Sequence, residues 1–181
     1  MNLPQRISVK FFIDIDNSLD VPALVPVFHR WIQENSLPGL LIDVADYKHV
    51  PDGPALLLLG HEGDYVLDRT DGRTGFLYRG KREWPSANLK ERLQVVWERA
   101  WQASQLLASE ETLSGLSFRT NEVAIDFPDR LNVPNSPETF DALREDVAAA
   151  LFELSGGQTW IVTHVNQEAR RPFSLQATLA E

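Results

Sequence analysis

The chain has 181 residues, of which 43% are hydrophobic, and carries a formal net charge of −9. The apolar content suffices for a folded core, and the negative charge argues against a general nucleic-acid binder, which has to neutralise phosphates. The sequence has no cysteine, which excludes disulfides, thiolate zinc sites and a cysteine nucleophile. Together with the lack of a membrane-length apolar run and of a signal-like start, this predicts a cytoplasmic protein with no membrane partner.

Charge is spread unevenly along the chain. Residues 1–67 carry four basic and nine acidic side chains, residues 68–99 carry eight and five, and residues 100–181 carry five and twelve. A basic middle segment therefore lies between two acidic ends. Such a chain can associate with copies of itself through opposite charges, or bind a small anion.

The first half of the chain reads mainly as strands. Strict alternation of apolar and polar residues predicts a strand over 7–15, with the odd-numbered side chains facing the core and Lys10 facing solvent. An apolar stripe then predicts a helix around 24–32. Short apolar runs predict four further strands, of which the last two are joined by a hairpin turn at Asp71-Gly72. These runs are 40–44, 55–59, 65–67 and 76–78.

The second half contains the longest helix, predicted at 87–109 from apolar residues at helical spacing. A strand at 122–127 follows, and then a helix that begins at Pro137, after a capping serine, and stops before a Gly-Gly pair. His164 occupies a polar position of the next strand and is expected to face solvent. The last two predicted strands are 160–165 and 173–179.

This order of elements predicts an α+β fold of one domain spanning 1–181. A largely antiparallel or mixed sheet would carry the helices on one face. Each half reads as strand, helix, strand, strand, so we interpret the chain as two similar units, at about 5–80 and 118–181, joined by the helix at 87–109.

Two segments carry a resemblance to a known enzyme family. Residues 11–19, Phe-Phe-Ile-Asp-Ile-Asp-Asn-Ser-Leu, resemble the first motif of the haloacid-dehalogenase-like phosphatases, in which an apolar strand ends in Asp-x-Asp-x-Thr. Residues 63–68, Gly-Asp-Tyr-Val-Leu-Asp, resemble the acidic fourth motif of that family. The resemblance implies a metal-dependent phosphatase in which Asp14 attacks phosphorus, Asp16 handles a proton and magnesium neutralises the phosphate.

The spacing of these motifs opposes catalysis. The interval between Asp14 and Asp64 has room for one helix and about two strands, whereas the parallel core of that family needs several crossovers of a dozen or more residues each. Asp14 and Asp16 also suit a turn at the end of a strand, because such side chains bond their own backbone. We therefore expect Asp14 and Asp16 to bind no magnesium.

Histidines and carboxylates follow two of the predicted strands. Asp46 and His49 come after one strand, and His61, Glu62 and Asp64 come after the next. If these strand ends converge, the side chains could hold zinc, iron or manganese, or carry out acid–base chemistry. Charged residues are also common at strand ends simply because loops are exposed to solvent, so the same pattern is typical of residues without a functional role. A divalent metal is expected only under the hydrolase alternative.

Basic residues gather on and around the predicted hairpin, with a tryptophan beside them. Arginines next to an aromatic ring can bind a phosphate. The acidic residues between them weaken the positive electrostatic potential, however, and favour a solvated hairpin or a contact with an acidic partner. Trp84 lies outside the helix stripes, so it is the aromatic side chain expected at a contact between copies in a homo-oligomer. The candidate binding residues are Arg69, Arg73, Arg79, Lys81, Arg82 and Trp84.

The remaining sequence carries no phosphate-binding loop, nucleophile elbow or Cys/His zinc pattern. Residues 29–33 and 41–47 resemble segments of bacterial proteins of similar length for which no activity is known, which implies a bacterial cytosolic protein. The sequence thus predicts a non-catalytic binding or assembly module. The alternative is a metal-dependent phosphatase or other hydrolase that uses Asp14 and Asp16, or the group around His61.

Overall fold

A computed structural model describes residues 4–14, 19–81, 88–113 and 115–180. Within these residues the chain forms an α+β fold of three α-helices and one eight-stranded sheet. The helices are α1 (Val21–Glu34), α2 (Leu89–Ala108) and α3 (Pro137–Leu154). The strands are β1 (Ser8–Ile13), β2 (Leu41–Asp46), β3 (Pro54–Gly60), β4 (Gly63–Asp68), β5 (Gly75–Gly80), β6 (Phe118–Phe127), β7 (Trp160–Val165) and β8 (Phe173–Leu179).

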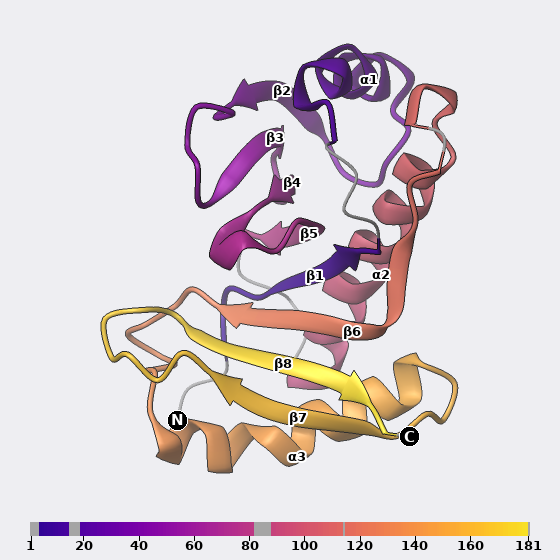
Figure 1. The fold of residues 1–181 in the computed structure, drawn as a ribbon. Helices are drawn as coiled ribbons and strands as arrows, with labels where there is room; N and C mark the ends of the chain where they lie inside the picture. Colours follow the sequence, from indigo (N-terminus) through magenta and orange to yellow (C-terminus); the bar gives the residue numbers. More distant parts are fainter. Residues whose placement is uncertain (1–3, 15–18, 82–87, 114, 181) are drawn as a thin grey trace.

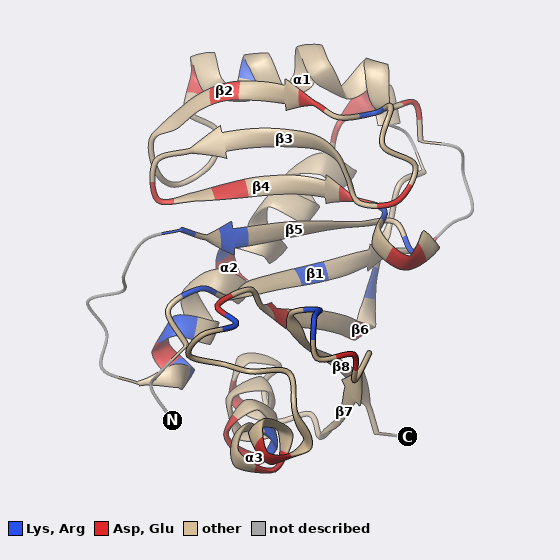
Figure 2. Ribbon diagram, turned by 90° about the vertical axis from the view of Figure 1, so that its left-hand side faces the viewer, with Lys and Arg blue, Asp and Glu red and all other residues tan. Residues whose placement is uncertain are grey.

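The sheet is antiparallel throughout and has the strand order β2-β3-β4-β5-β1-β6-β8-β7. The N-terminal strand therefore lies in the middle, between β5 and β6, while β2 and β7 form the two edges (Figure 1). Figure 2 looks onto the sheet from the side opposite α2, which lies behind β5 and β1. We call the side away from α2 the open face.

The core forms between the sheet and the helices because β1 alternates as the sequence predicts. Ile7, Val9 and Phe11 are fully buried on the helix side. The ring of Phe11 lies 4.9 Å from that of Trp97 and 5.0 Å from that of Trp101, both on α2. Aromatic pairs at such distances add to the free energy of burial, so they fix the longest helix across the central strands.

The helix ends follow from local side chains. The Asn88 side chain accepts a hydrogen bond from the backbone N–H of Glu91 at 2.8 Å and caps α2. Ser136 accepts from the backbone N–H of Thr139 at 3.3 Å, and Pro137 occupies the first turn of α3, as predicted. At the end of α1, Asn35 adopts the left-handed conformation that terminates a helix.

The predicted α+β fold class is confirmed, with the sheet antiparallel rather than mixed. The one large boundary difference is β6. It begins at Phe118 instead of residue 122, because the buried Phe118 pairs with Ile13 at the end of β1. Among the described residues, none of the helices is long and apolar enough to cross a membrane. The duplication of two similar units stays a prediction.

The prediction that Lys10 faces solvent is wrong. Lys10 does lie on the open face, opposite the core, but only 4% of its surface is exposed. No helix covers it. Its Nζ donates to Asp68 Oδ2 at 2.7 Å and to the carbonyl of Arg73 at 2.5 Å, so neighbouring side chains of the open face bury it.

Candidate functional site

Charged side chains occupy the centre of the open face, where Figure 2 shows basic and acidic segments on β4, β5, β1 and β6. Lys10 on β1 reaches Asp68 on β4 across the intervening strand β5. Gly75 permits this crossing, because a Cβ at that position would lie 2.7 Å from Lys10 Cε. Asp68 also accepts from the backbone N–H and the hydroxyl of Thr70, at 3.1 and 2.8 Å, so both of its carboxylate oxygens are hydrogen-bonded.

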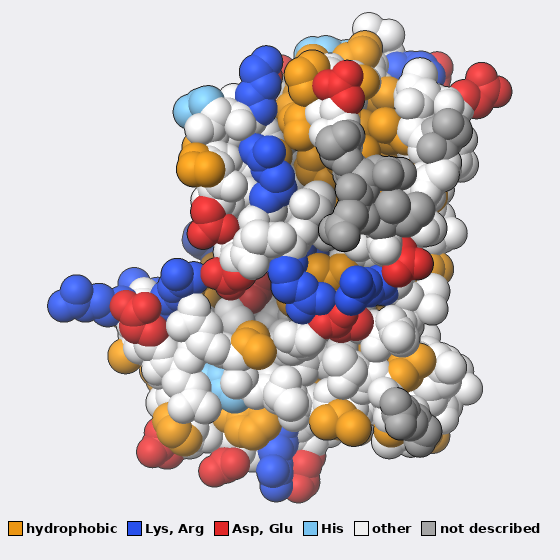
Figure 3. Space-filling view, in the orientation of Figure 1, with side chains coloured by type: hydrophobic (Ala, Val, Ile, Leu, Met, Phe, Trp, Pro, Cys, Tyr) orange, Lys and Arg blue, Asp and Glu red, His pale blue; other side chains and the backbone are white. Residues whose placement is uncertain are grey.

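A second set of ion pairs centres on Glu122 of β6. Its carboxylate accepts from Arg73 at 2.7 Å, from Arg119 at 2.9 Å and from Gln176. The Arg73 guanidinium lies over the ring of Phe12, 3.8 Å from its centroid. Figure 3, which has the orientation of Figure 1, shows basic and acidic side chains side by side across the middle of the molecule. We call Lys10, Asp68, Arg73, Glu122 and Arg119 the central charged network.

The pKa values of two carboxyls on this face move in opposite directions. Burial alone would raise the pKa of Glu122, but hydrogen bonds from Arg73 and Arg119 outweigh it and lower the pKa. Burial raises the pKa of Asp126, although Ser174 donates to it and Lys10 lies nearby. Glu122 therefore stays ionised as part of a structural ion pair with Arg73 and Arg119.

The structure separates the residues of the phosphatase resemblance. In the register of the sheet, Asp64 on β4 pairs with Arg79 on β5, and Arg79 pairs with Ser8 on β1. Asp14 lies six residues beyond Ser8 along the chain. At about 3.3 Å per residue this places the two carboxylates about 20 Å apart. Asp14 is exposed and lies 3.7 Å from Arg119. Asp16 lies outside the described residues.

The predicted metal-ligand group does not assemble either. Asp46 pairs with Leu56, five residues before His61, so the two ends of the group lie about 16 Å apart along β3. Glu62 pairs with Arg99 at 3.3 Å, and Asp64 accepts from Lys81 Nζ at 2.6 Å. His49 follows Asp46 at the far end. Among the described residues no cluster of histidines and carboxylates could hold a metal ion.

The predicted basic residues are similarly dispersed. Arg69 donates to the carbonyls of Lys48 and Val50 at 3.1 Å, and Arg73 belongs to the central charged network. Arg79 has a buried Nε with no hydrogen-bond partner within the described chain. Arg82 and Trp84 lie outside the described residues, so their predicted role in a contact is untested.

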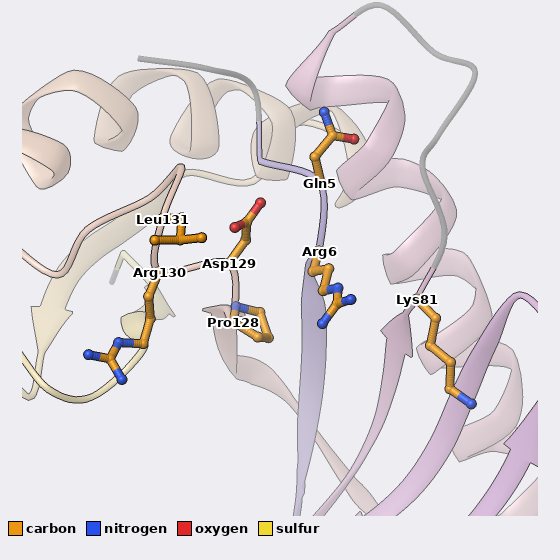
Figure 4. A pocket seen from close by; sticks show the side chains of 7 residues that line it. All are labelled: Gln5, Arg6, Lys81, Pro128, Asp129, Arg130 and Leu131. Carbon is orange, nitrogen blue, oxygen red and sulfur yellow. The ribbon is translucent and has the colours of Figure 1, made fainter.

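A pocket of about 470 Å³ opens where the ends of β1, β5 and β6 meet (Figure 4). Arg6, Lys81 and Arg130 contribute positive charge to its walls, and Asp129 contributes one carboxylate. In Figure 4 the Arg130 and Lys81 side chains point away from the centre, in opposite directions. Lys81 is held by Asp64. The basic groups therefore do not converge on one point in the pocket.

The predicted exposure of His164 is wrong. Its ring lies on the helix side of β7, stacked on Phe140 at 5.6 Å and 5.0 Å from the ring of Phe173. Its Nε2 lies 2.6 Å from Asn135 Oδ1, and burial lowers the pKa of the imidazole. The alternation in this strand places His164 on the inner side, where its ring packs against two phenylalanines.

Exposed apolar side chains concentrate at the two edges of the sheet. Leu40 and Ile42, at the start of β2, are 61% and 57% exposed, and Tyr47 follows the same strand. At the other edge, Ile161 on β7 is 53% exposed and Phe152 on α3 is 47% exposed. Sequence reasoning missed these positions because an exposed apolar residue in a strand pattern looks the same as a buried one.

Comparison with protein-family models, with curated protein sequences and with solved structures finds no match to this chain.

Proposed function

We propose that this protein is a non-catalytic binding and assembly module, with its contact surfaces at the edges of the sheet. One observation carries the proposal: of the six large apolar side chains exposed in the described chain, five lie at β2 or at β7 and its neighbouring helix, and the sixth, Leu131, follows β6. Apolar side chains gathered at an unpaired strand edge are typical of a surface that a partner covers. These residues are Leu40, Ile42, Tyr47, Phe152 and Ile161.

The arrangement of polar groups supports the same proposal. A catalyst brings its carboxylates and histidines together within hydrogen-bond reach of one reacting atom. In the described residues, Asp64, Asp68 and Glu122 are each held by a basic partner at 2.6 to 2.7 Å. Of the residues in the hydrolase alternative, Asp14 is exposed and far from Asp64, and Asp16 lies outside the described residues.

We further propose that the module forms homo-oligomers in the cytoplasm of a bacterium. The basic segment 68–99 between two acidic ends supports a contact between identical copies. Static light scattering at micromolar concentration, in low and in high salt, tests it. A mass above 20.5 kDa that falls as salt is added is expected, because salt screens charge contacts. A monomer in both buffers contradicts the homo-oligomer.

A further inference from the structure

The outer side of β7 presents backbone groups that nothing in the described chain satisfies. The Ala180 N–H donates to the Thr159 carbonyl at 2.9 Å, and the β7–β8 ladder continues in this register. Backbone groups of successive residues in an antiparallel strand point to opposite sides. Trp160, Val162 and His164 therefore direct their N–H and C=O groups away from β8. Within the described residues, none of these groups has a hydrogen-bond partner.

At the opposite edge of the sheet, an acidic side chain occupies an outward backbone group and opposes the addition of a strand, although apolar side chains beside it remain exposed. On β2 the outward N–H of Val44 donates to the carboxylate of Asp43 at 2.8 Å. The ladder between β2 and β3 is interrupted between Leu41 and Asp43, and Asp46 adds a second negative charge to the strand. Bulges and charged side chains are the devices by which edge strands avoid pairing with other chains. β7 has none of them, since its six residues include no aspartate, glutamate, lysine, arginine or proline.

The surroundings of β7 are apolar on both sides of the free edge. Ile161 projects from the open face, and Phe152 on α3 lies 3.7 Å from the position of a Cβ on Gly157, in the loop that leads into β7. An incoming strand would therefore gain backbone hydrogen bonds along its length and apolar contacts at alternate residues. That combination is the basis of strand addition in peptide-binding domains.

A second copy of the chain fits this edge poorly. α3 packs directly against β7, and Figure 1 shows it running along the edge below that strand. Two copies joined edge to edge would place β7 about 4.8 Å from the β7 strand of the other copy. The two α3 helices would then come similarly close to each other. Packed helices need about 8 to 10 Å between their axes. A single extended segment brings no helix and avoids this clash.

We propose that β7 binds an extended peptide segment of another protein, apolar at alternate residues, as an additional strand of the sheet. The inference rests on the binding role proposed above and assigns it a site and a class of partner. The homo-oligomer contact, which involves the basic segment, is separate from this site.

Backbone amide hydrogen exchange, followed by NMR, tests the proposal on the unmodified protein. The probe is a synthetic peptide with the sequence of 173–179, because this segment already pairs with β7 on its other side and alternates apolar and polar residues. The amides of Trp160, Val162 and His164 are expected to exchange fast in the free protein and at least several-fold more slowly with the peptide bound. Protection of all three in the free protein would contradict the proposal, because the edge would then be covered already.

A proline variant supplies the matched comparison. Val162→Pro removes an outward N–H and leaves the β7–β8 ladder intact, so the fold is expected to survive. It should weaken binding of the fluorescein-labelled peptide by about tenfold, the effect of about 1.4 kcal/mol of lost hydrogen bonding. Val44→Pro makes the same change at the β2 edge and should leave peptide binding unchanged.

The outcomes separate this inference from the general function. Equal loss of binding in both proline variants, or no binding of the peptide to the unmodified protein, overturns the β7 site. If light scattering still shows an oligomer in that case, the assembly role stands and only its peptide partner is lost.

Discussion

Lys10 is a buried basic side chain at the centre of the open face, and its ion pair with Asp68 determines how this face tolerates substitution. The ammonium group lies in a site with about 5% side-chain exposure on both partners of the Lys10–Asp68 pair. Removing one member of a buried pair leaves the other charge without compensation, and this is more costly than the net contribution of the intact pair. The central charged network should therefore be sensitive to single substitutions.

We expect Lys10→Met to lower the free energy of unfolding by about 3 to 5 kcal/mol, because the buried Asp68 would lose its basic partner. Urea denaturation followed by tryptophan fluorescence measures the change. Lys48→Met is the matched control, since Lys48 pairs with Asp46 at 3.2 Å with the lysine side chain about half exposed, and should cost under about 1 kcal/mol. Equal losses for the two variants would show that Lys10 is not held as described.

Asp126 and Glu122 should give stability opposite dependences on pH. The pKa of Asp126 is raised on folding, so the folded chain binds this proton more tightly. The stabilisation that this tighter proton binding gives the fold is complete below the unfolded pKa of about 3.9, and it is lost as the pH rises through the folded pKa. Asp126→Asn is uncharged throughout, so its stability relative to the unmodified protein should increase as the pH rises from about 4.

Glu122→Gln is the comparison for this experiment. The pKa of Glu122 is lowered, so its ionised form stabilises the fold above about 4.3, and this contribution is lost as the pH falls through the folded pKa. Glu122→Gln should therefore be destabilising at pH 7 and less so near pH 3. Urea denaturation at a series of pH values measures both, and a parallel pH profile for the two variants would refute the assignment.

At the scale of elements, the two edges of one sheet use different chemistry. β2 carries an acidic side chain that occupies an outward backbone N–H, whereas β7 leaves its outward groups unoccupied. We expect Asp43→Ala to accelerate amide exchange at Val44 by up to about tenfold, because the hydrogen bond from this N–H is lost. Asp43→Asn retains an acceptor oxygen and should preserve most of the protection. Unchanged exchange in Asp43→Ala would show that the carboxylate does not protect this edge.

Most elements were predictable because their determinants are local. Period-two alternation in β1, the capping serine before α3 and the Asp71-Gly72 turn each act within a few residues. The positive backbone φ of both turn residues, +57° and +67°, is the conformation that this pair favours. The burial of Lys10 was not predictable, since it depends on Asp68 being brought two strands away and on a glycine between them.

The candidate site was less predictable for the same reason. Grouping His61 with Asp46 assumed that consecutive strands end at the same edge, but antiparallel pairing places their ends on opposite sides. The free edge of β7 depends on strand order, which no local pattern specifies. Its uncharged sequence, Trp-Ile-Val-Thr-His-Val, was the available signal, and it reads equally well as an interior strand.

For the molecule as a whole, the antiparallel topology predicts no response to phosphatase ligands. A magnesium and beryllofluoride mixture at a hundred times its dissociation constant would stabilise a binding protein by about 2.7 kcal/mol, which raises Tm by about 5 to 10 °C for a chain of this size. We expect differential scanning fluorimetry to show an unchanged Tm. A rise of several degrees that is abolished in Asp14→Asn would restore the hydrolase alternative.

The central place of β1 has a consequence for how the chain reaches its fold during synthesis. Ser8 pairs with Arg79 on one side and with Asp126 on the other, so β1, which is made before the seven other described strands, is among the last to be completed. The meander from β2 to β5 joins strands that are adjacent in sequence and can assemble from local contacts. Until Phe127 has left the ribosome, one edge of β1 has no partner strand and its apolar side chains lack their full core. A nascent chain in that interval is a natural target for chaperones.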